Sequence, residues 1–287
     1  MESDQKYVPE KIWEWDQKGE GKYGKINRPT AGSRIKSKMP VGKHPLQLYS
    51  LATPNGVKVT ILLEELLALG YSDAEYDAHL ISINDEDQFR SGFVEINPNS
   101  KIPALVDHSV KPSQRIFESG SILLYLAEKF ESFIPKDLAS RTECISWLFW
   151  QMSSAPYLGG GFGHFYNYAP IKIKYAIDRF SMETKRQLDV LDQHLNKNQY
   201  MCGNNYTIAD IAIWPWYGVL ALGKLYNAGE FLEVESYTHV QRWTKEIGDR
   251  KAVQLGRMIN RTWGEESEQV TERHNGEDLS GKSGVII

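Results

Sequence analysis

The pattern of apolar and polar residues divides the chain near Pro135. Before this point, an apolar stripe over 59–67 that ends at Gly70 predicts an amphipathic helix with a glycine C-cap. Short alternating or apolar runs are typical of strands, and four occur here, at 46–51, 76–83, 102–106 and 115–117. Ser119 follows the last run and is predicted to cap a further helix. The order β-α-β and then β-β-α implies a mixed sheet with one parallel pair.

After Pro135 the chain shows only helical periodicity. Four segments carry it, at 138–152, 170–196, 207–225 and 238–260. Thr207-Ile208-Ala209-Asp210 adds a capping-box pattern, which we assign to folding rather than to catalysis. Gly159-Gly160-Gly161-Phe162-Gly163 matches no phosphate-binding motif and predicts a loop that breaks the helical pattern.

These patterns predict an α/β part followed by an all-helical part. Residues 1–44 are polar with scattered aromatic side chains, and we interpret them as an extension that packs over another part of the molecule. The α/β domain is expected over 45–133 and the helical domain over 138–262. Residues 263–287 are polar and contain several glycines, so we expect a loosely held tail.

Composition narrows the class of protein. The chain has 287 residues, of which 41% are apolar and 24% charged, as in globular proteins of about two domains. A net charge of -4 gives no support to a nucleic-acid partner, which needs a basic surface. The longest stretch without charged residues, 144–171, contains Pro156 and several glycines, so no membrane span is expected.

The cysteine and histidine content excludes further classes. Cys144 and Cys202 are too few and too far apart for a disulfide framework or a zinc ribbon. The seven histidines are dispersed without a metal-binding motif, so no metal is expected. The first residues lack the apolar run of a secretory signal, and the reducing cytoplasm is the expected compartment.

Two junctions between a strand and a helix carry candidate chemistry. At Thr53-Pro54-Asn55, a hydroxyl, an amide and backbone N–H groups meet at a helix start, where a thiolate would be stabilised. Neither cysteine is near this turn in sequence, so the thiol would have to arrive with a ligand; an ordinary proline turn is the alternative. At Glu118-Ser119, the backbone N–H groups of the helix start are suited to binding a ligand carboxylate, and Glu118 is suited to binding a ligand ammonium group. The alternative is an ordinary helix cap, which has the same sequence pattern.

The order of these motifs resembles that of the cytosolic glutathione transferases. A strand, turn and helix precede Ser100-Lys101-Ile102-Pro103-Ala104-Leu105, and Glu118-Ser119 and a helical half with Thr207-x-x-Asp210 follow. Thr53-Pro54-Asn55-Gly56, Asn97-Pro98-Asn99-Ser100 and Phe117-Glu118-Ser119-Gly120-Ser121 are similar to the bacterial nu class of the family. The resemblance covers roughly residues 46–260 and implies a thioredoxin-like N-terminal domain, a helical C-terminal domain and a homodimer.

The resemblance assigns roles around one glutathione. Thr53 and Asn55 match the residues near the sulfur, and Glu118 and Ser119 match those that hold the γ-glutamyl end. From the residues alone a trans peptide bond is favoured at Ile102-Pro103. The family has a cis bond there, with backbone groups of the residue at position 102 facing the cysteinyl part. Two neighbours in the matching motifs complete this first set of candidates, Pro54 and Lys101.

The resemblance also implies a second glutathione at the same site. Asn27, Gln88 and Arg179 match residues that complete such a double site. Gln151 matches a glutamine near the middle of a helix. However, Gln151-Met152 is shifted by one position relative to the family pattern, which leaves a ligand contact of Gln151 open.

The function implied by the resemblance is glutathione-dependent reduction of small disulfides without a protein cysteine. One glutathione thiolate would attack the disulfide and the second would resolve the mixed disulfide. The first alternative is conjugation to electrophiles or reduction of organic hydroperoxides, with the aromatic residues within 162–168 beside the sulfur. The second alternative is a non-catalytic glutathione binder, because fold alone does not fix function.

Overall fold

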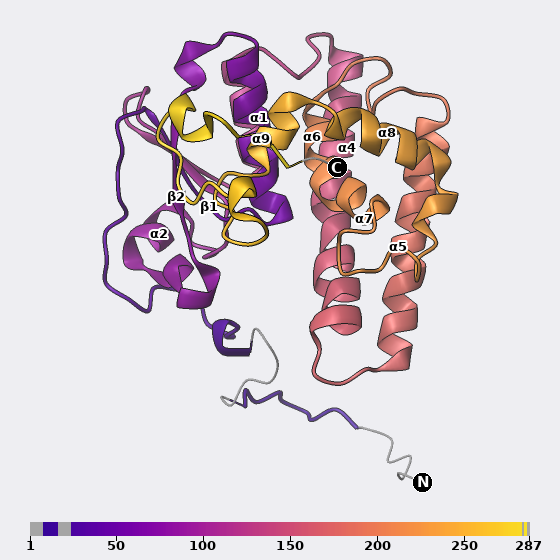
Figure 1. Cartoon of the computed structure of the whole chain (residues 1–287). Helices are drawn as coiled ribbons and strands as arrows, with labels where there is room; N and C mark the ends of the chain where they lie inside the picture. The colour runs from indigo at the N-terminus through magenta and orange to yellow at the C-terminus, as the bar shows by residue number, and fades with distance from the viewer. Residues whose placement is uncertain (1–7, 17–23, 283, 286–287) are drawn as a thin grey trace.

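The structure places a sheet with its helices beside a bundle of longer helices (Figure 1). It is a computed structural model that describes residues 8–16, 24–282 and 284–285. The predicted thioredoxin-like and all-helical halves are both present, while the predicted domain bounds stay predictions.

Within the described residues, the sheet has four strands in the order β2-β1-β3-β4. β1 (Leu46–Ser50) pairs in parallel with β2 (Tyr76–Leu80) and antiparallel with β3 (Ala104–Asp107). β3 in turn pairs antiparallel with β4 (Gln114–Phe117). The predicted mixed sheet with one parallel pair is therefore confirmed.

Helices cover the two faces of this sheet. α1 (Pro54–Ala68) and α3 (Ser119–Lys129) share one apolar core with Leu46 and Leu48, whose side chains point to the same face of β1. Tyr49 points to the other face and packs with Phe93 of α2 (Ser91–Ile96). All residues of β1 are consequently buried, as expected for a central strand.

The start of α3 differs from the prediction. Ser119 is its first helical residue, and Glu118 occupies the N-cap position with φ 70°. The Ser119 hydroxyl caps no backbone N–H and instead accepts a hydrogen bond from Lys58 Nζ at 3.2 Å. The serine is thus drawn toward a buried polar cluster, and this tertiary contact outweighs the capping preference of its side chain.

The helical half is built from two long helices and several shorter segments. Its helical elements are α4 (Leu138–Pro156), the π-helical η5 (Tyr157–Tyr168), α5 (Lys174–Leu195), α6 (Ile208–Ile213), the π-helical η6 (Trp214–Gly218), α7 (Val219–Ala221), α8 (Thr238–Gly248) and α9 (Lys251–Gly256). Short 3-10 turns occur at η1 (Gly24–Ile26), η2 (Ser72–Ala74), η3 (Ile83–Asp85), η4 (Asp87–Phe89), η7 (Val234–Ser236), η8 (Glu266–Glu268) and η9 (Gly276–Leu279). The predicted capping box is confirmed at the start of α6, where Thr207 and Asp210 bond reciprocally.

The predicted loop at 159–163 is wrong, because η5 continues helically through these glycines. A Cβ atom on Gly159 would lie 2.6 Å from the Trp216 ring, and one on Gly161 would lie 2.3 Å from the Phe180 ring. A Cβ atom on Gly163 would meet the Tyr226 ring at the same 2.3 Å. The glycines therefore serve the close approach of aromatic side chains rather than a break in the helix.

The expected loose tail is also wrong. Arg273 is 1% exposed, and its backbone pairs with Ala78 of the edge strand β2. Its guanidinium forms ion pairs with Glu64 and Glu75, while Val285 is buried and hydrogen-bonded to Gln254. The tail thus covers an open sheet edge, which is a common way to protect unpaired strand groups.

The extension packs over the sheet half, as predicted, along its second part. The Tyr49 hydroxyl donates to Pro40 O at 2.7 Å, and Ser37 N donates to Ser91 Oγ at 3.1 Å. Residues 8–16 are exposed and run away from the body of the molecule (Figure 1). Among the helices of the described ranges, none combines the length and apolar character needed to cross a membrane.

Candidate functional site

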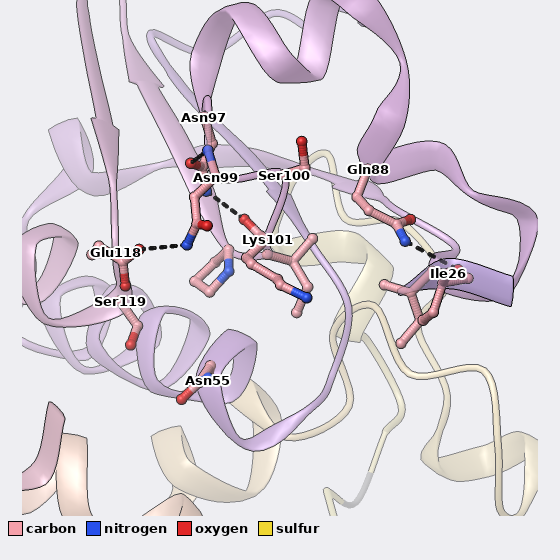
Figure 2. A pocket seen from close by; sticks show the side chains of 12 residues that line it. Ile26, Asn55, Gln88, Asn97, Asn99, Ser100, Lys101, Glu118 and Ser119 are labelled. Atoms are coloured by element: carbon pink, nitrogen blue, oxygen red, sulfur yellow. Dashed lines mark hydrogen bonds between the residues drawn. The ribbon is translucent and has the colours of Figure 1, made fainter. Parts of the chain in front are cut away.

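A cavity of about 300 Å³ lies where the start of α1 meets the turn before β3 and the start of α3 (Figure 2). Its lining comes almost entirely from the sheet half. The lining residues are Ile26, Asn55, Ile83, Gln88, Asn97, Asn99, Ser100, Lys101, Ile102, Pro103, Glu118 and Ser119.

The turn before β3 is held by the side chain of Asn97. Its Nδ2 donates to Lys101 O at 2.6 Å, and its Oδ1 accepts from Asn99 N at 2.9 Å. The peptide bond between Ile102 and Pro103 is cis, so the trans bond favoured by the residues alone is wrong and the expectation from the family resemblance is met. The turn contributes Ser100, Lys101 and Ile102 to the cavity lining.

Glu118 faces this turn across the cavity. It has φ 70°, a left-handed conformation that is rare for a residue with a side chain, and such strained residues concentrate at functional sites. Asn99 Nδ2 donates to Glu118 Oε1 at 3.3 Å (Figure 2). Lys101 adds a positive charge to the same cavity. A carboxylate and an ammonium together suit a ligand that carries both kinds of charge.

Two polar atoms of the lining are buried without a partner among the described residues. They are Ser100 Oγ and Gln88 Oε1. The other amide atom of Gln88, Nε2, donates to Ile83 O at 3.3 Å. Since buried polar atoms are normally hydrogen-bonded, these two oxygens indicate that the cavity fits a polar ligand.

Asn55 lies at the start of α1, where the family resemblance predicts the sulfur of glutathione. Its Oδ1 accepts hydrogen bonds from Lys58 Nζ at 2.9 Å and from Trp216 Nε1 at 2.8 Å. Lys58 is 1% exposed and also donates to Ser119 Oγ and, at 2.7 Å, to Gln151 Oε1. Burial lowers the pKa of Lys58 well below its usual value, while the Glu118 charge acts in the opposite direction.

The structure brings most of the predicted site residues together. Those that line the cavity are Asn55, Gln88, Lys101, Ile102, Pro103, Glu118 and Ser119. Thr53 is the N-cap of α1, but its hydroxyl accepts no backbone N–H of the helix. Pro54 is the first residue of α1 and lines a separate hollow of about 290 Å³ with Arg257 and Trp263.

Three more predicted residues lie outside the lining, in addition to Thr53 and Pro54. Gln151 is fully buried behind it and contacts Lys58. Asn27 is exposed beside Ile26, and Arg179 is exposed on α5. Their roles toward a ligand stay predictions.

Sequence reasoning missed Lys58 and Trp216. Lys58 had a weak signal, because it is a charged residue inside the buried part of α1, between Val57 and Val59. Trp216 had none, since 161 positions separate it from Asn55. Neither Lys58 nor Trp216 lines the cavity itself. The lining residues that were not predicted are Ile26, Ile83, Asn97, Asn99 and Ser100.

Both cysteines of the chain lie outside the cavity, in the helical half. The Cys144 and Cys202 thiols are hydrogen-bonded to each other, and Thr207 Oγ1 lies 3.4 Å from Cys202 Sγ. The hydrogen bond to Cys202 lowers the pKa of Cys144, whereas the bond to Cys144 and burial raise that of Cys202. The described ranges contain no cluster of side chains suited to a metal ion.

The aromatic residues of η5 pack on one another and on aromatic residues of the helical half, and none of them lines the cavity. Phe162 is fully buried and stacks with Tyr166, while Phe165 stacks with Phe180 on α5. Tyr168 contacts Tyr226 edge to face. The apolar pocket that the conjugation alternative placed beside the sulfur is therefore not lined by these side chains.

A thioredoxin-like half with a polar cavity at the start of α1, joined to a helical half, is the architecture of a glutathione S-transferase. Residues 44–128 match the family model of the glutathione S-transferase N-terminal domain, and residues 170–251 match that of the C-terminal domain. The chain belongs to this family. It is 62% identical over 277 residues to the disulfide-bond oxidoreductase YghU of Escherichia coli (strain K12), a match that covers 96% of each protein.

Solved structures of relatives have the same fold. Glutathione transferase YghU from Streptococcus pneumoniae, complexed with glutathione, superposes with a TM-score of 0.87 at 53% identity, covering 89% of this chain and 98% of that one. A family member from Pseudomonas fluorescens with two glutathiones bound has a TM-score of 0.69 at 39% identity, covering 74% of this chain and 92% of that one.

Proposed function

We propose that this protein is a glutathione-dependent disulfide-bond oxidoreductase that reduces small disulfides with thiols supplied by glutathione. The observation that carries the proposal is a cavity at the start of α1 whose lining offers the Asn55 amide but no cysteine. The protein's own two thiols are free and lie elsewhere, in the helical half. The relatedness to an oxidoreductase that acts on disulfide bonds supports the same reaction.

The chemistry is two successive thiol–disulfide exchanges. The thiolate of a first glutathione attacks one sulfur of the substrate disulfide, which forms a mixed disulfide and releases one substrate thiolate. A second glutathione thiolate attacks the glutathione sulfur of the mixed disulfide and releases the other substrate thiolate together with oxidised glutathione. Two glutathione thiols are oxidised and one disulfide is reduced to two thiols, with the two protons passing to the products.

The cavity supplies what the first glutathione needs. Glu118 suits the ammonium of the γ-glutamyl end, and Ser119 with the first backbone N–H groups of α3 suits its carboxylate. The backbone of Ile102 suits the cysteinyl part. Asn55 in the first turn of α1, which follows the N-cap residue Thr53, suits the thiolate, because N–H donors and a helix N-terminus lower a thiol pKa.

A second glutathione is supported by the shape of the lining. Gln88 and Ile26 lie on the far side of the cavity from Glu118 and Ser119 (Figure 2). Gln88 Oε1 is buried without a partner among the described residues, and the Pseudomonas fluorescens relative holds two glutathiones. Asn27 and Arg179 stay candidates for completing this second subsite.

We further propose that the protein belongs to the nu class of the family, forms a homodimer and is located in the cytoplasm. The assignment to the nu class rests on the Thr53 and Asn55 pair. The dimer is supported by exposed apolar side chains on α4 and α5, which need a cover: Leu138, Phe149, Tyr175 and Met182. The compartment follows from the reaction, since it consumes reduced glutathione, which the cytosol maintains. Light scattering at micromolar concentration should give twice the mass of the chain.

The test is turnover of 2-hydroxyethyl disulfide with glutathione, coupled to glutathione reductase, in the wild type and in a C144S/C202S variant. The double variant should keep its turnover, because the sulfur that reacts belongs to glutathione. Loss of turnover in a folded double variant would show that a protein thiol takes part. Calorimetry with glutathione should give two molecules per subunit.

Rates with two other substrates separate the proposed function from its alternatives. Rates with chlorodinitrobenzene and cumene hydroperoxide are expected to be lower than the rate with the disulfide, since the aromatic residues of η5 are packed away from the cavity. Faster conjugation or peroxide reduction would reassign the site, and undetectable glutathione binding would favour a protein without this activity.

A further inference from the structure

The orientation of the Asn55 amide is fixed by its neighbours. Trp216 Nε1–H is a donor only, and Lys58 Nζ donates in either protonation state. Both lie within 2.9 Å of the same amide atom of Asn55, so that atom must be the oxygen. An amide turned the other way would place N–H groups against N–H groups.

This orientation leaves Asn55 Nδ2 as the amide atom available to the cavity. Nδ2 donates to no residue that the structure describes, whereas Oδ1 is occupied by Lys58 and Trp216. Asn55 lies in the first turn of α1, where the helix dipole also favours negative charge. The side chain is therefore presented as an N–H donor.

We propose that Lys58 and Trp216 are positioning residues that hold Asn55 as an N–H donor to the sulfur of bound glutathione. This inference rests on the proposed function, because it concerns the thiolate that the reaction uses. Lys58 holds Asn55 from within α1, and Trp216 holds it from η6 of the helical half. The thiolate site is thus completed by a residue from the other half of the molecule.

Lys58 joins the two ends of the glutathione cavity. The same Nζ that donates to Asn55 also donates to Ser119 Oγ, at the end assigned to the γ-glutamyl group. Gln151 Oε1 accepts from it as well, from a position fully buried in α4. Gln151 is accordingly placed as a support of Lys58.

Trp216 has its own support in the packing of η5. The ring lies against Gly159, where a Cβ atom would come within 2.6 Å of it. Only glycine leaves room for the indole at this distance. The contact fixes the ring so that its N–H reaches Asn55.

The test measures the pKa of the bound glutathione thiol from its ultraviolet thiolate absorbance as a function of pH, beside kcat and KM. W216F removes the indole N–H and keeps an aromatic ring. It should raise the thiol pKa and lower kcat about five- to tenfold, the effect of losing one ordinary hydrogen bond, with KM for glutathione changed less than about twofold. K58M should act in the same direction.

W214F is the matched control. Trp214 is a neighbouring buried indole whose Nε1 donates to Thr244 O at 3.0 Å, and neither residue lines the cavity. W214F should leave the thiol pKa unchanged, even if it lowers stability. A shift of the same size in W214F would mean that general loosening of η6 causes the effect, and would overturn the inference.

A double-mutant cycle decides whether Trp216 acts through Asn55. In the N55A background the amide is gone, so W216F should cause no further shift in the thiol pKa. A full shift there, or no shift of W216F in the wild-type background, would overturn the positioning role while leaving the proposed function intact. Failure of the wild type to bind glutathione would refute the proposed function and the inference together.

Discussion

Lys58 and Asp210 are two buried ionisable side chains with very different surroundings. Asp210 is fully buried and accepts hydrogen bonds from Met201 N, Thr207 N and Trp243 Nε1, all within the helical half. Lys58 is buried to the same degree. Its hydrogen bonds reach side chains on α1, α3 and α4, and two of these side chains, Asn55 and Ser119, line the cavity.

The difference separates a folding role from a functional one. Two of the donors to Asp210 are backbone N–H groups, those of Met201 and of Thr207 at the start of α6, so the carboxylate satisfies donors that the fold itself leaves open. The partners of Lys58 are two side-chain amides and a hydroxyl, and two of these three groups belong to residues that line the cavity. A buried amine among such groups lowers their freedom, which is what a binding site requires.

The largest effect is expected at Asp210. D210A leaves buried donors of Met201, Thr207 and Trp243 without acceptors, which should lower the free energy of unfolding by about 3 kcal/mol or more. Urea unfolding measures this loss. Activity per folded molecule should stay within about twofold of the wild type. A large loss of activity in folded D210A would mean that Asp210, like Lys58, has a functional role.

The K58M variant should lose more activity than stability, which is the reverse of the result expected for D210A. Methionine keeps the apolar stem and removes the amine, so the free energy of unfolding should fall by only about 1–2 kcal/mol, from acceptors left unpaired. Turnover of the disulfide should fall about tenfold, because Asn55 and Ser119 lose a shared donor. Equal losses of stability in K58M and D210A would indicate that Lys58 is chiefly structural.

A pair of glycine variants tests the link between η5 and the site. G159A places a Cβ atom against the Trp216 ring and should reduce turnover by at least about threefold through displacement of the ring. Gly160 has open space around its Cβ position, so G160A should leave turnover unchanged. Equal turnover in the two variants would show that the exact placement of Trp216 is unimportant.

Asp210 and Lys58 are also expected to give opposite dependences of stability on pH. Burial raises the pKa of Asp210 from 3.8 to about 6, so its contribution to stability is present below pH 3.8 and is lost as pH rises through about 6. Burial lowers the pKa of Lys58, so its contribution is present above pH 10.5 and is lost as pH falls through the lowered value. Urea unfolding across pH should show an acidic slope that D210N removes and an alkaline slope that K58M removes.

Much of the fold could be predicted from the sequence because its signals are local. The strand pattern of 46–51, the helix ended by Gly70 and the capping box at Thr207 depend on neighbours within a few residues. Each appears in the structure within a few positions of its predicted place. The cavity lining was predictable where it lies in continuous motifs, such as 101–103 and 118–119.

The errors occurred where a long-range contact outweighs a local preference. Ser119 has the composition of a cap but bonds to Lys58. The glycines of η5 have the composition of a loop but accommodate aromatic rings from other elements. The tail is polar, yet Arg273 is buried because Glu64 and Glu75 form ion pairs with it.

The sequence by itself determined the chain order of the strands and helices and the family, because these features are carried by periodicity and by short motifs. It also predicts the turn at which a ligand thiol would be held. Only the tertiary structure decided which atom of Asn55 faces the cavity. Hydrogen bonds fix that orientation, and the donor in η6 is 161 residues away along the chain. Such a contact leaves no periodic or local trace in the amino-acid sequence, since it forms only when the two halves pack together.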